Sequence, residues 1–532
     1  MTDRTPVDDA DVCVIGAGPA GALVADRLAG EYEVAVLDAG PRFDDDDRLD
    51  RQERAIRPYY DRPDVWEMGG PRDDHAASGE WFYPLNHARV KGIGGSTLHW
   101  QGMVMRLHED DFNSGSARGV GPDWPIEYEH LRPYYAAAER ELGVSGAVDN
   151  PYGPPRESPY PLPAFPPSYS DSLFAEACEE LGIDMHSVPN ARNSEPYQGR
   201  SQCVGYGTCQ PVCPSGAKYD ATVHIDRAEQ RGATVIDRAP VQLLAHGPDS
   251  IDAAVYATPD GEEHTQAADA FVVACGGVET PRLLLLSASE TYPDGLANTS
   301  GAVGRYFMDH LFAGAGGVVD RETRQNHVGF YTSSSQQFYD EADEEFAPLK
   351  LEFFNYDGPS PVEMALSGGD WGDDLLDRLR GSYGNHLGIG ALVEQRPQAE
   401  SYVGLGEETD DHGNPVPDVH WTVDDRALRT IERANEIQRE ILTELDAELT
   451  WQVGPDETGP AYHHMGTTRM GTDPTESVVD PDCRTHDLDN CWIASSSVFP
   501  TGGAVNPTLT IAALALRTAD HVDRSLANGV SG

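Results

Sequence analysis

The feature that most constrains the fold of this chain is a glycine-rich turn close to its N-terminus. The turn follows the apolar run 12–15, which predicts a buried strand, and opens the helical run 20–28. In such a unit Gly16 permits the tight turn, Gly18 lets the backbone approach a pyrophosphate, and Gly21 lets the helix pack closely on the strand. The helix N-terminus then offers free N–H groups and positive dipole charge to the phosphates.

A second strand and an acidic residue complete this unit. Residues 34–37 form another apolar run, and Asp38 stands at its end. A carboxylate about 20 residues after the glycines can accept hydrogen bonds from a ribose. The continuous apolar run 270–275, followed by an apolar helix through Leu286, suits a further buried parallel strand. The sequence therefore predicts a dinucleotide-binding α/β domain.

The order of the segments favours FAD over NAD as the dinucleotide. An NAD domain usually continues directly into further βαβ units, whereas here a second glycine cluster intervenes, with Gly94, Gly95 and Ser96 followed by His99. Small residues in such a loop let the backbone pass against a flat ring system and leave N–H groups for a flavin's polar edge. The alternative is a glycine loop that packs only on protein.

Segments of different composition alternate along the chain. Segments 1–120, 201–320 and 461–532 carry the features of nucleotide binding. Segment 121–200 is rich in proline and tyrosine, and segment 321–460 carries acidic loops and aromatic runs. We expect the first three segments to form one discontinuous FAD-binding domain and the other two to form a substrate-binding cap domain.

The C-terminal segment contains residues suited to alcohol oxidation. Removal of a hydride from an alcohol carbon leaves a proton on the hydroxyl, and a neutral histidine is suited to receive it. Adjacent residues of an extended segment point to opposite sides. We therefore expect His463 to face the pocket and His464 to be a satisfied core residue. A second polar side chain, such as Asn506, would hold the substrate oxygen and align its carbon.

Three of the eight cysteines gather in the loop 203–218, at the junction of the two expected domains. Cys203, Cys209 and Cys213 stand among glycines and a Cys-Pro pair, which are features of ferredoxin loops. Three ligands without a nearby fourth would suit a three-iron cluster. Three alternatives stay open: free structural cysteines, a zinc site completed from elsewhere in the chain, and a Cys203–Cys209 disulfide.

The charge of the chain is strongly one-sided. It has 89 acidic and 38 basic residues, for a net charge of -51. We expect a halophilic protein, because concentrated salt shortens the Debye length to about 3 Å at 1 M and screens self-repulsion. Such a surface repels nucleic acid and anionic lipid, so neither is an expected partner.

Two further observations bear on location. No apolar run approaches the roughly 20 residues that a bilayer span needs. The N-terminus lacks the basic and apolar regions of a secretion signal and goes directly into a strand. Together they predict a cytoplasmic location by default and no direct membrane span.

These motifs together resemble the glucose–methanol–choline (GMC) oxidoreductases, particularly their bacterial sugar and polyol dehydrogenases. The resemblance runs over essentially the whole chain, through segments 16–21, 94–100, 274–286, 303–310 and 463–520. It implies an α/β fold in which a Rossmann-like FAD-binding domain is interleaved with an α+β substrate domain containing an antiparallel sheet.

The resemblance also implies roles for individual residues. The family's catalytic histidine falls on His463, three residues before a Gly-Thr pair, and its second catalytic position falls on Asn506. In some relatives a histidine spaced like His99 is covalently bound to the flavin. The remaining FAD contacts that it implies are Val241, Ser497, Pro507 and Thr508.

The activity implied by the resemblance is hydride transfer from a sugar or polyol to FAD. In these dehydrogenases a [3Fe–4S] cluster, here at the three clustered cysteines, passes electrons towards a cytochrome-type acceptor, and a small accessory subunit exports the flavoprotein. Three alternatives stay open: an oxidase that uses molecular oxygen, a lyase that keeps FAD without redox turnover, and a subunit that has lost catalysis.

Overall fold

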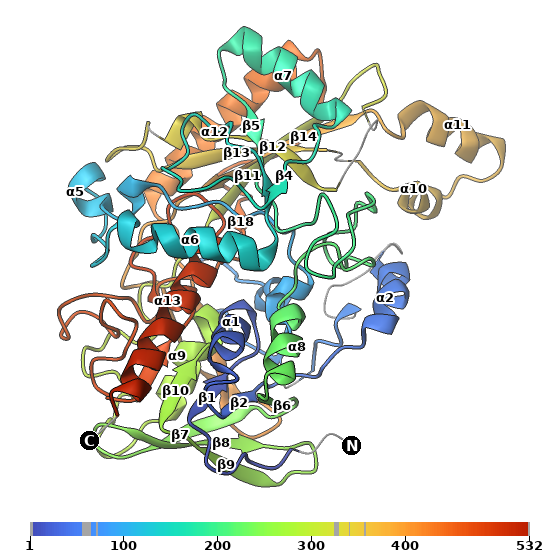
Figure 1. Cartoon of the computed structure of the whole chain (residues 1–532). Helices are drawn as coiled ribbons and strands as arrows, with labels where there is room; N and C mark the ends of the chain where they lie inside the picture. The colour runs from blue at the N-terminus through green and yellow to red at the C-terminus, as the bar shows by residue number, and fades with distance from the viewer. Residues whose placement is uncertain are drawn as a thin grey trace.

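Two β-sheets, each with its own hydrophobic core, organise the chain (Figure 1). The structure is a computed structural model that describes residues 4–55, 65–70, 73–323, 329–339, 341–355 and 358–529. One sheet is parallel and lies in the lower half of the view, and the other is antiparallel and lies in the upper half. This combination confirms the expected fold class.

The parallel sheet has the strand order β19-β10-β1-β2-β6. Its strands are β1 (Val12–Ile15), β2 (Val34–Leu37), β6 (Thr234–Ile236), β10 (Ala270–Val273) and β19 (Cys491–Ile493). All residues of β1, β2, β10 and β19 are buried, as continuous apolar runs predict for a sheet covered on both faces. The first two strands coincide with the predicted runs.

Helices from distant parts of the sequence pack beside this sheet. Helix α1 (Pro19–Leu28) lies between α8 (Thr222–Gln230) and α13 (Thr508–Ala527), so both ends of the chain meet in one layer (Figure 1). Helix α9 (Gly276–Leu286) follows β10 and contacts a separate, three-stranded sheet. That sheet consists of β7 (Val241–His246), β8 (Ile251–Ala257) and β9 (Glu263–Ala267).

The antiparallel sheet has the order β17-β11-β14-β13-β12-β5, with β18 paired to β11. Its strands are β5 (His186–Ser187), β11 (Leu311–Val318), β12 (Tyr331–Ser335), β13 (Leu349–Phe354), β14 (His386–Val393), β17 (Glu448–Val453) and β18 (Gly459–Pro460). Along β13 the odd-numbered residues 349–353 belong to the core shared with α7 (Tyr169–Leu181) and α12 (Asp425–Glu444). The even-numbered side chains therefore point to the opposite face, away from these helices.

The remaining elements are short or peripheral. The helices are α2 (Arg48–Ala55), α4 (Leu85–Ala88), α5 (Ser114–Arg118), α6 (Tyr128–Leu142), α10 (Pro361–Ser367) and α11 (Asp373–Ser382), and the strands are β3 (Ser145–Gly146), β4 (Leu162–Pro163), β15 (Tyr402–Thr409) and β16 (Pro415–His420). Among the described helices, none combines the length and the apolar character that a membrane crossing requires.

The packing favours two changes to the expected domain boundaries. Strand β11 pairs with β14 and β17, so residues 311–318 belong with the antiparallel sheet, although the expected boundary was at 320. Helix α6 packs on α13, and its apolar side chains join the core of the parallel sheet, although 121–200 was expected in the cap domain. The domain division remains a proposal, in which β11 now belongs to the substrate-binding domain and α6 to the FAD-binding domain.

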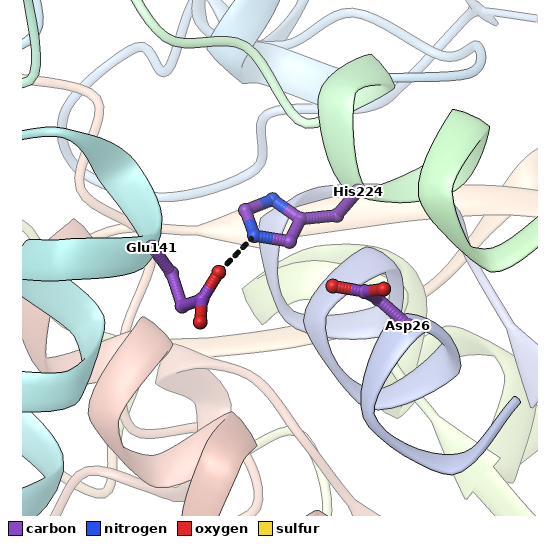
Figure 2. A group of neighbouring side chains, drawn as sticks. All are labelled: Asp26, Glu141 and His224. Atoms are coloured by element: carbon purple, nitrogen blue, oxygen red, sulfur yellow. Dashed lines mark hydrogen bonds and ion pairs between the residues drawn. The ribbon is translucent and has the colours of Figure 1, made fainter. Parts of the chain in front are cut away.

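An ionic cluster ties three helices of the lower half together. Figure 2 shows Asp26 of α1, Glu141 of α6 and His224 of α8 side by side, with His224 Nε2 3.3 Å from Glu141 Oε2. The guanidinium of Arg227 lies 2.8 Å from Asp26 and 2.8 Å from Glu141. Arg231 lies 3.1 Å from Asp26 as well. Because these two cations balance the two carboxylates, the cluster can join the helices without a metal ion.

Candidate active site

A cavity of about 920 Å³ is lined by residues from both halves of the molecule. The parallel-sheet half contributes the glycine turn, Asp38 and much of segment 95–103. The strands of the antiparallel sheet contribute Phe312, Tyr331, Glu352, Phe354, Leu392 and Val453, with Gly459 and Pro460 of β18. One cavity therefore joins the expected cofactor site to the expected substrate domain.

The N-terminal glycines have the geometry that a bound pyrophosphate requires. Gly16 has φ of 103°, and a Cβ there would lie 2.6 Å from the carbonyl oxygen of Ala274. A Cβ at Gly21 would overlap the carbonyl oxygen of Gly16. Gly18 instead lines the cavity, where a Cβ would meet no atom within 4 Å, and no side chain caps the N-terminus of α1. The open space and uncapped N–H groups fit the phosphates of FAD.

Asp38 is held at the edge of the cavity by backbone donors. Its carboxylate accepts hydrogen bonds from the N–H groups of Ala17 at 2.8 Å and Gly40 at 2.9 Å. Burial raises the pKa of Asp38, while these two N–H groups act in the opposite direction. A carboxylate has about four acceptor positions, so oxygen lone pairs remain for a ribose.

The second glycine cluster packs directly against the first. Gly95 has φ of 55°, and a Cβ there would lie 2.9 Å from Cα of Gly18. Gly95, Ser96 and His99 line the cavity, whereas Gly94 is absent from its wall and supplies a left-handed turn with φ of 103°. The close contact between the two glycine segments explains why a larger residue is excluded at position 95.

Three of the four remaining expected FAD contacts line the cavity, namely Val241, Pro507 and Thr508. Ser497 does not. Its side chain is fully buried, and its hydroxyl accepts a hydrogen bond from Thr468 at 2.6 Å. The neighbouring residues Ser495 and Ser496 line the cavity instead.

His463 and Asn506 meet at the wall of the same cavity, as the sequence predicts. Asn506 Nδ2 lies 3.4 Å from His463 Nε2, and both residues line the cavity. The backbone N–H of His463 donates to Asp309 Oδ1 at 2.7 Å, and the preceding Tyr462 has a left-handed φ of 69°. This anchored, strained backbone fixes the direction of the imidazole.

A second histidine sets the tautomer of His463. His310 Nε2 lies 2.7 Å from the carbonyl oxygen of Gly503, which can only accept, so Nε2 carries the proton. Burial lowers the pKa of His310 to about 4, so its ring is neutral and its Nδ1 is an acceptor. This Nδ1 lies 2.8 Å from His463 Nδ1. His463 must therefore be protonated at Nδ1, which leaves a lone pair on Nε2 facing Asn506.

The electrostatic environment keeps His463 in the form of a base. Burial lowers the pKa of His463 well below its usual value, and the neighbouring His310 and Lys350 lower it further. The imidazole is then neutral at neutral pH, as a proton acceptor must be.

A buried lysine sets the orientation of Asn506. Lys350 is fully buried, and its Nζ donates to Asn506 Oδ1 at 2.8 Å. Because the amide oxygen is engaged by this ammonium group, Nδ2 must face His463 and the cavity as a donor. The same Nζ lies 2.8 Å from Glu352 Oε1.

The expectation for His464 is wrong. Its ring packs against Tyr83 and Phe307, but the residue also lines the cavity beside His463. Its Nε2 is buried and has no hydrogen-bond partner within the described part of the chain. A polar ring atom left unpaired at a cavity wall is what a site for a polar cofactor would show.

All eight cysteines of the chain are free in the structure. The alternative of a disulfide between Cys203 and Cys209 in the cysteine loop is therefore excluded. Cys209 and Cys213 are buried, and Cys203 is partly buried. The three thiols do not form a group with all ligand atoms within 4.8 Å of one another, unlike the Asp26 cluster, within the described ranges.

Buried cations surround these thiols. Arg192 Nη1 donates to Cys209 Sγ at 3.6 Å, while its Nε and Nη2 are buried without partners among the described residues. Lys218 is buried, and its Nζ donates to the carbonyl groups of Leu98, Trp100 and Cys209. Burial lowers the pKa of Lys218 to about 8. An anionic, thiolate-bound cluster would complement these cations.

Four residues at the site were missed by the sequence reasoning, namely Asp309, His310, Lys350 and Glu352. A signal for the last two exists in the pattern of β13, where two charged residues alternate with apolar ones in a strand that is otherwise apolar. Nothing in the sequence pattern alone places that strand beside Asn506.

Comparison with known proteins agrees with this geometry. Family models described as GMC oxidoreductase match residues 84–312 and 397–515. The fructose dehydrogenase large subunit of Gluconobacter japonicus is 34% identical, over 98% of this chain and 99% of that protein. The 2-methyl-1,2-propanediol dehydrogenase of Mycolicibacterium austroafricanum is 31% identical, over 98% and 96%. Pyridoxine 4-oxidase from Mesorbium loti has a similar fold, with a TM-score of 0.68 at 19% identity, over 97% and 99%.

Proposed function

Because the chain belongs to the GMC oxidoreductases and is thus an FAD-dependent oxidoreductase acting on CH–OH groups, we propose that it is a sugar or polyol dehydrogenase. The observation that carries this proposal is the pairing of His463 Nε2 and Asn506 Nδ2 at the wall of the cavity that the glycine turn also lines. Two relatives named for a ketose and for a vicinal diol support the substrate class.

The residues of the site divide the work of alcohol oxidation. FAD, when bound, supplies the hydride acceptor. Asn506 Nδ2 donates to the substrate oxygen and so fixes the carbon that is oxidised. His463 Nε2 takes the hydroxyl proton, and His310 Nδ1 accepts from His463 Nδ1–H, which stabilises the imidazolium that results. A positioned base of this kind contributes about 10²–10⁴ in rate.

The cysteine loop is the proposed exit for electrons. We propose that Cys203, Cys209 and Cys213 hold a [3Fe–4S] cluster, which would pass electrons one at a time to an external acceptor. Two contacts support this position. Gln210, next to Cys209, lines the cavity and accepts a hydrogen bond from Gln101 at 2.9 Å. Lys218 Nζ donates both to the carbonyl group of Cys209 and to that of Trp100, which follows the second glycine cluster.

An external acceptor implies partners. The fructose dehydrogenase relative is named as a large subunit, which supports an accessory subunit and a cytochrome-type acceptor for this chain. We retain the cytoplasm as the default location, with export alongside such a subunit as the alternative. Expression with and without neighbouring genes, followed by cell fractionation, tests this assignment.

The test of the function is anaerobic mixing of the purified holoprotein with sugars, polyols and simple alcohols. We expect the oxidised flavin absorption to bleach with polyols and an iron–sulfur EPR signal to change as electrons leave the flavin. Replacement of Cys209 by serine should abolish that EPR signal while the flavin still bleaches. A flavin that stays oxidised with every alcohol would indicate a lyase, and rapid oxygen consumption without an added acceptor would indicate an oxidase.

The acidic surface supports a further proposal, adaptation to concentrated salt. At a net charge of -51, self-repulsion should destabilise the fold at low ionic strength. We expect the melting temperature to rise between 0.1 M and 2 M KCl, measured by calorimetry, because screening increases over that range. A melting temperature that is unchanged or lower in 2 M KCl would contradict salt adaptation.

A further inference from the structure

One carboxylate from a strand of the antiparallel sheet lies at the wall of the cavity near the catalytic pair. Among the described residues of the antiparallel sheet, Glu352 is the single charged side chain that lines the cavity, beside Phe354 on the same strand. It is 3% exposed, so water hardly reaches it. Burying a carboxylate in such surroundings costs free energy unless its oxygens have hydrogen-bond or ion-pair partners.

The protein itself satisfies only part of the hydrogen-bonding capacity of this carboxylate. Glu352 Oε1 forms an ion pair with Lys350 Nζ at 2.8 Å, but among the described residues this oxygen has no hydrogen-bond partner. The hydrogen bond that Lys350 Nζ donates at this site goes to Asn506 Oδ1. The carboxylate therefore keeps acceptor capacity at the wall of the cavity.

Lys350 fixes the position of the Glu352 carboxylate relative to Asn506. Asn506 Oδ1 and Glu352 Oε1 each lie 2.8 Å from the same Nζ atom, so the two oxygens are within twice that distance of each other. A substrate whose hydroxyl accepts from Nδ2 of the same amide would have its neighbouring carbon atoms within reach of Glu352. A hydroxyl on one of those carbons could donate to the carboxylate, whereas a second carboxylate there would be repelled.

On the premise of the proposed function, we propose that Glu352 is the specificity-determining residue and that Lys350 is a positioning residue. Glu352 accepts a hydrogen bond from a hydroxyl adjacent to the one being oxidised. The substrate class is therefore neutral compounds with neighbouring hydroxyl groups, in preference to single-hydroxyl alcohols and to sugar acids.

The test compares matched substrates within each protein. Anaerobic flavin reduction is measured with 1,2-propanediol, 1-propanol, glycerol, D-sorbitol and D-gluconate, on the wild-type holoprotein and on Glu352→Leu and Glu352→Gln. We expect the preference for 1,2-propanediol over 1-propanol, taken as a ratio of kcat/KM, to fall about tenfold or more in Glu352→Leu. In Glu352→Gln part of that preference should remain, while discrimination against D-gluconate is lost.

The ratio guards against variants that fold poorly, because both substrates meet the same population of active sites. FAD content and melting temperature are measured beside it. Glu448→Gln is the matched control, since Glu448 lies on β17 of the same sheet but is exposed and outside the cavity wall. Its substrate ratios should equal those of the wild type.

Two negative outcomes have different meanings. Flavin reduction by alcohols with ratios that do not change in Glu352→Leu would overturn the specificity role and leave the dehydrogenase function standing. If no alcohol reduces the flavin, the dehydrogenase function fails, and binding of D-sorbitol to the oxidised holoprotein, measured by calorimetry, decides the site. Binding that Glu352→Leu weakens would support the polyol site, and absence of binding would overturn it.

Discussion

The two halves of the molecule build their parts of the cavity in different ways. In the parallel-sheet half, the groups that face the cofactor come from short segments whose backbone conformation is dictated locally, such as the turn Gly16–Gly21. In the antiparallel half, the groups that face the cavity come from alternate positions along strands, such as Glu352 and Phe354 of β13. The first half is specified by backbone geometry, and the second by which face of a strand is turned inward.

This difference teaches where single substitutions should act. A change in the glycine turn alters the space for backbone and cofactor, so its effect should appear in FAD binding and stability. A change on the inward face of β13 alters hydrogen-bond donors and acceptors, so its effect should appear in turnover and selectivity. His463 belongs to neither pattern alone, because Asp309, just before β11, holds its backbone while its ring faces the shared cavity.

The largest effect should follow removal of the base at the junction of the halves. We expect His463→Ala to slow anaerobic flavin reduction about 10²–10⁴-fold, because it removes the proposed proton acceptor beside Asn506 Nδ2. FAD content should stay that of the wild type, since the glycine turn is intact. Stopped-flow absorbance measures the rate. A loss below about threefold would mean that another group takes the proton.

The next effect concerns the orientation of Asn506. In Lys350→Leu the amide loses the donor that fixes it, and we expect kcat to fall roughly 10–100-fold, since hydrogen bonds to charged groups contribute about 1.5–3 kcal/mol. Lys350→Gln is the control, because a glutamine amide can still donate to Asn506 Oδ1 although the charge is lost. Equal losses in both variants would show that charge, and not orientation, is what Lys350 provides.

Two glycines of one turn should respond differently to the same methyl group. Gly21→Ala forces a Cβ into the backbone of Gly16, so we expect a loss of about 1–3 kcal/mol in the free energy of unfolding. Gly18→Ala meets no protein atom within 4 Å, so the apoprotein should keep its stability while FAD binds more weakly. Urea unfolding and FAD titration measure the two quantities. Equal destabilisation by both changes would contradict this division.

The smallest expected effect is a displacement along the pH axis. Flavin reduction requires neutral His463, and burial holds the pKa of His463 well below its usual value. The rate should therefore stay constant as the pH falls through 6.5 and decline only at lower pH, where His463 becomes protonated. The pH profile of the stopped-flow rate, taken with KCl held constant, measures this. A decline centred near 6.5 would mean that the base is exposed to water.

The same contrast explains what the sequence could predict. The strands 12–15 and 34–37 and the glycine turn are confirmed, and His463 and Asn506 meet at the cavity, because local spacing or a family motif carries these features. The catalytic roles of the two residues remain a proposal. The expectation for His464 was wrong, and Ser497 lies outside the cavity wall, because which of several neighbouring residues faces a cavity depends on the twist of a loop within its tertiary packing. Lys350 and Glu352 were missed because their meeting with Asn506 requires the register of β13, which no local pattern states.

The most direct test of the central claim, that one cavity joins a flavin on the glycine turn to the base His463, is the rate of anaerobic flavin reduction by a polyol deuterated at its CH–OH carbons. The account predicts that the bound FAD bleaches and that bleaching is slower with the deuterated compound, because the C–H bond breaks in that step. Folded protein that takes up no FAD, or a bound flavin that stays oxidised with both compounds, would contradict it.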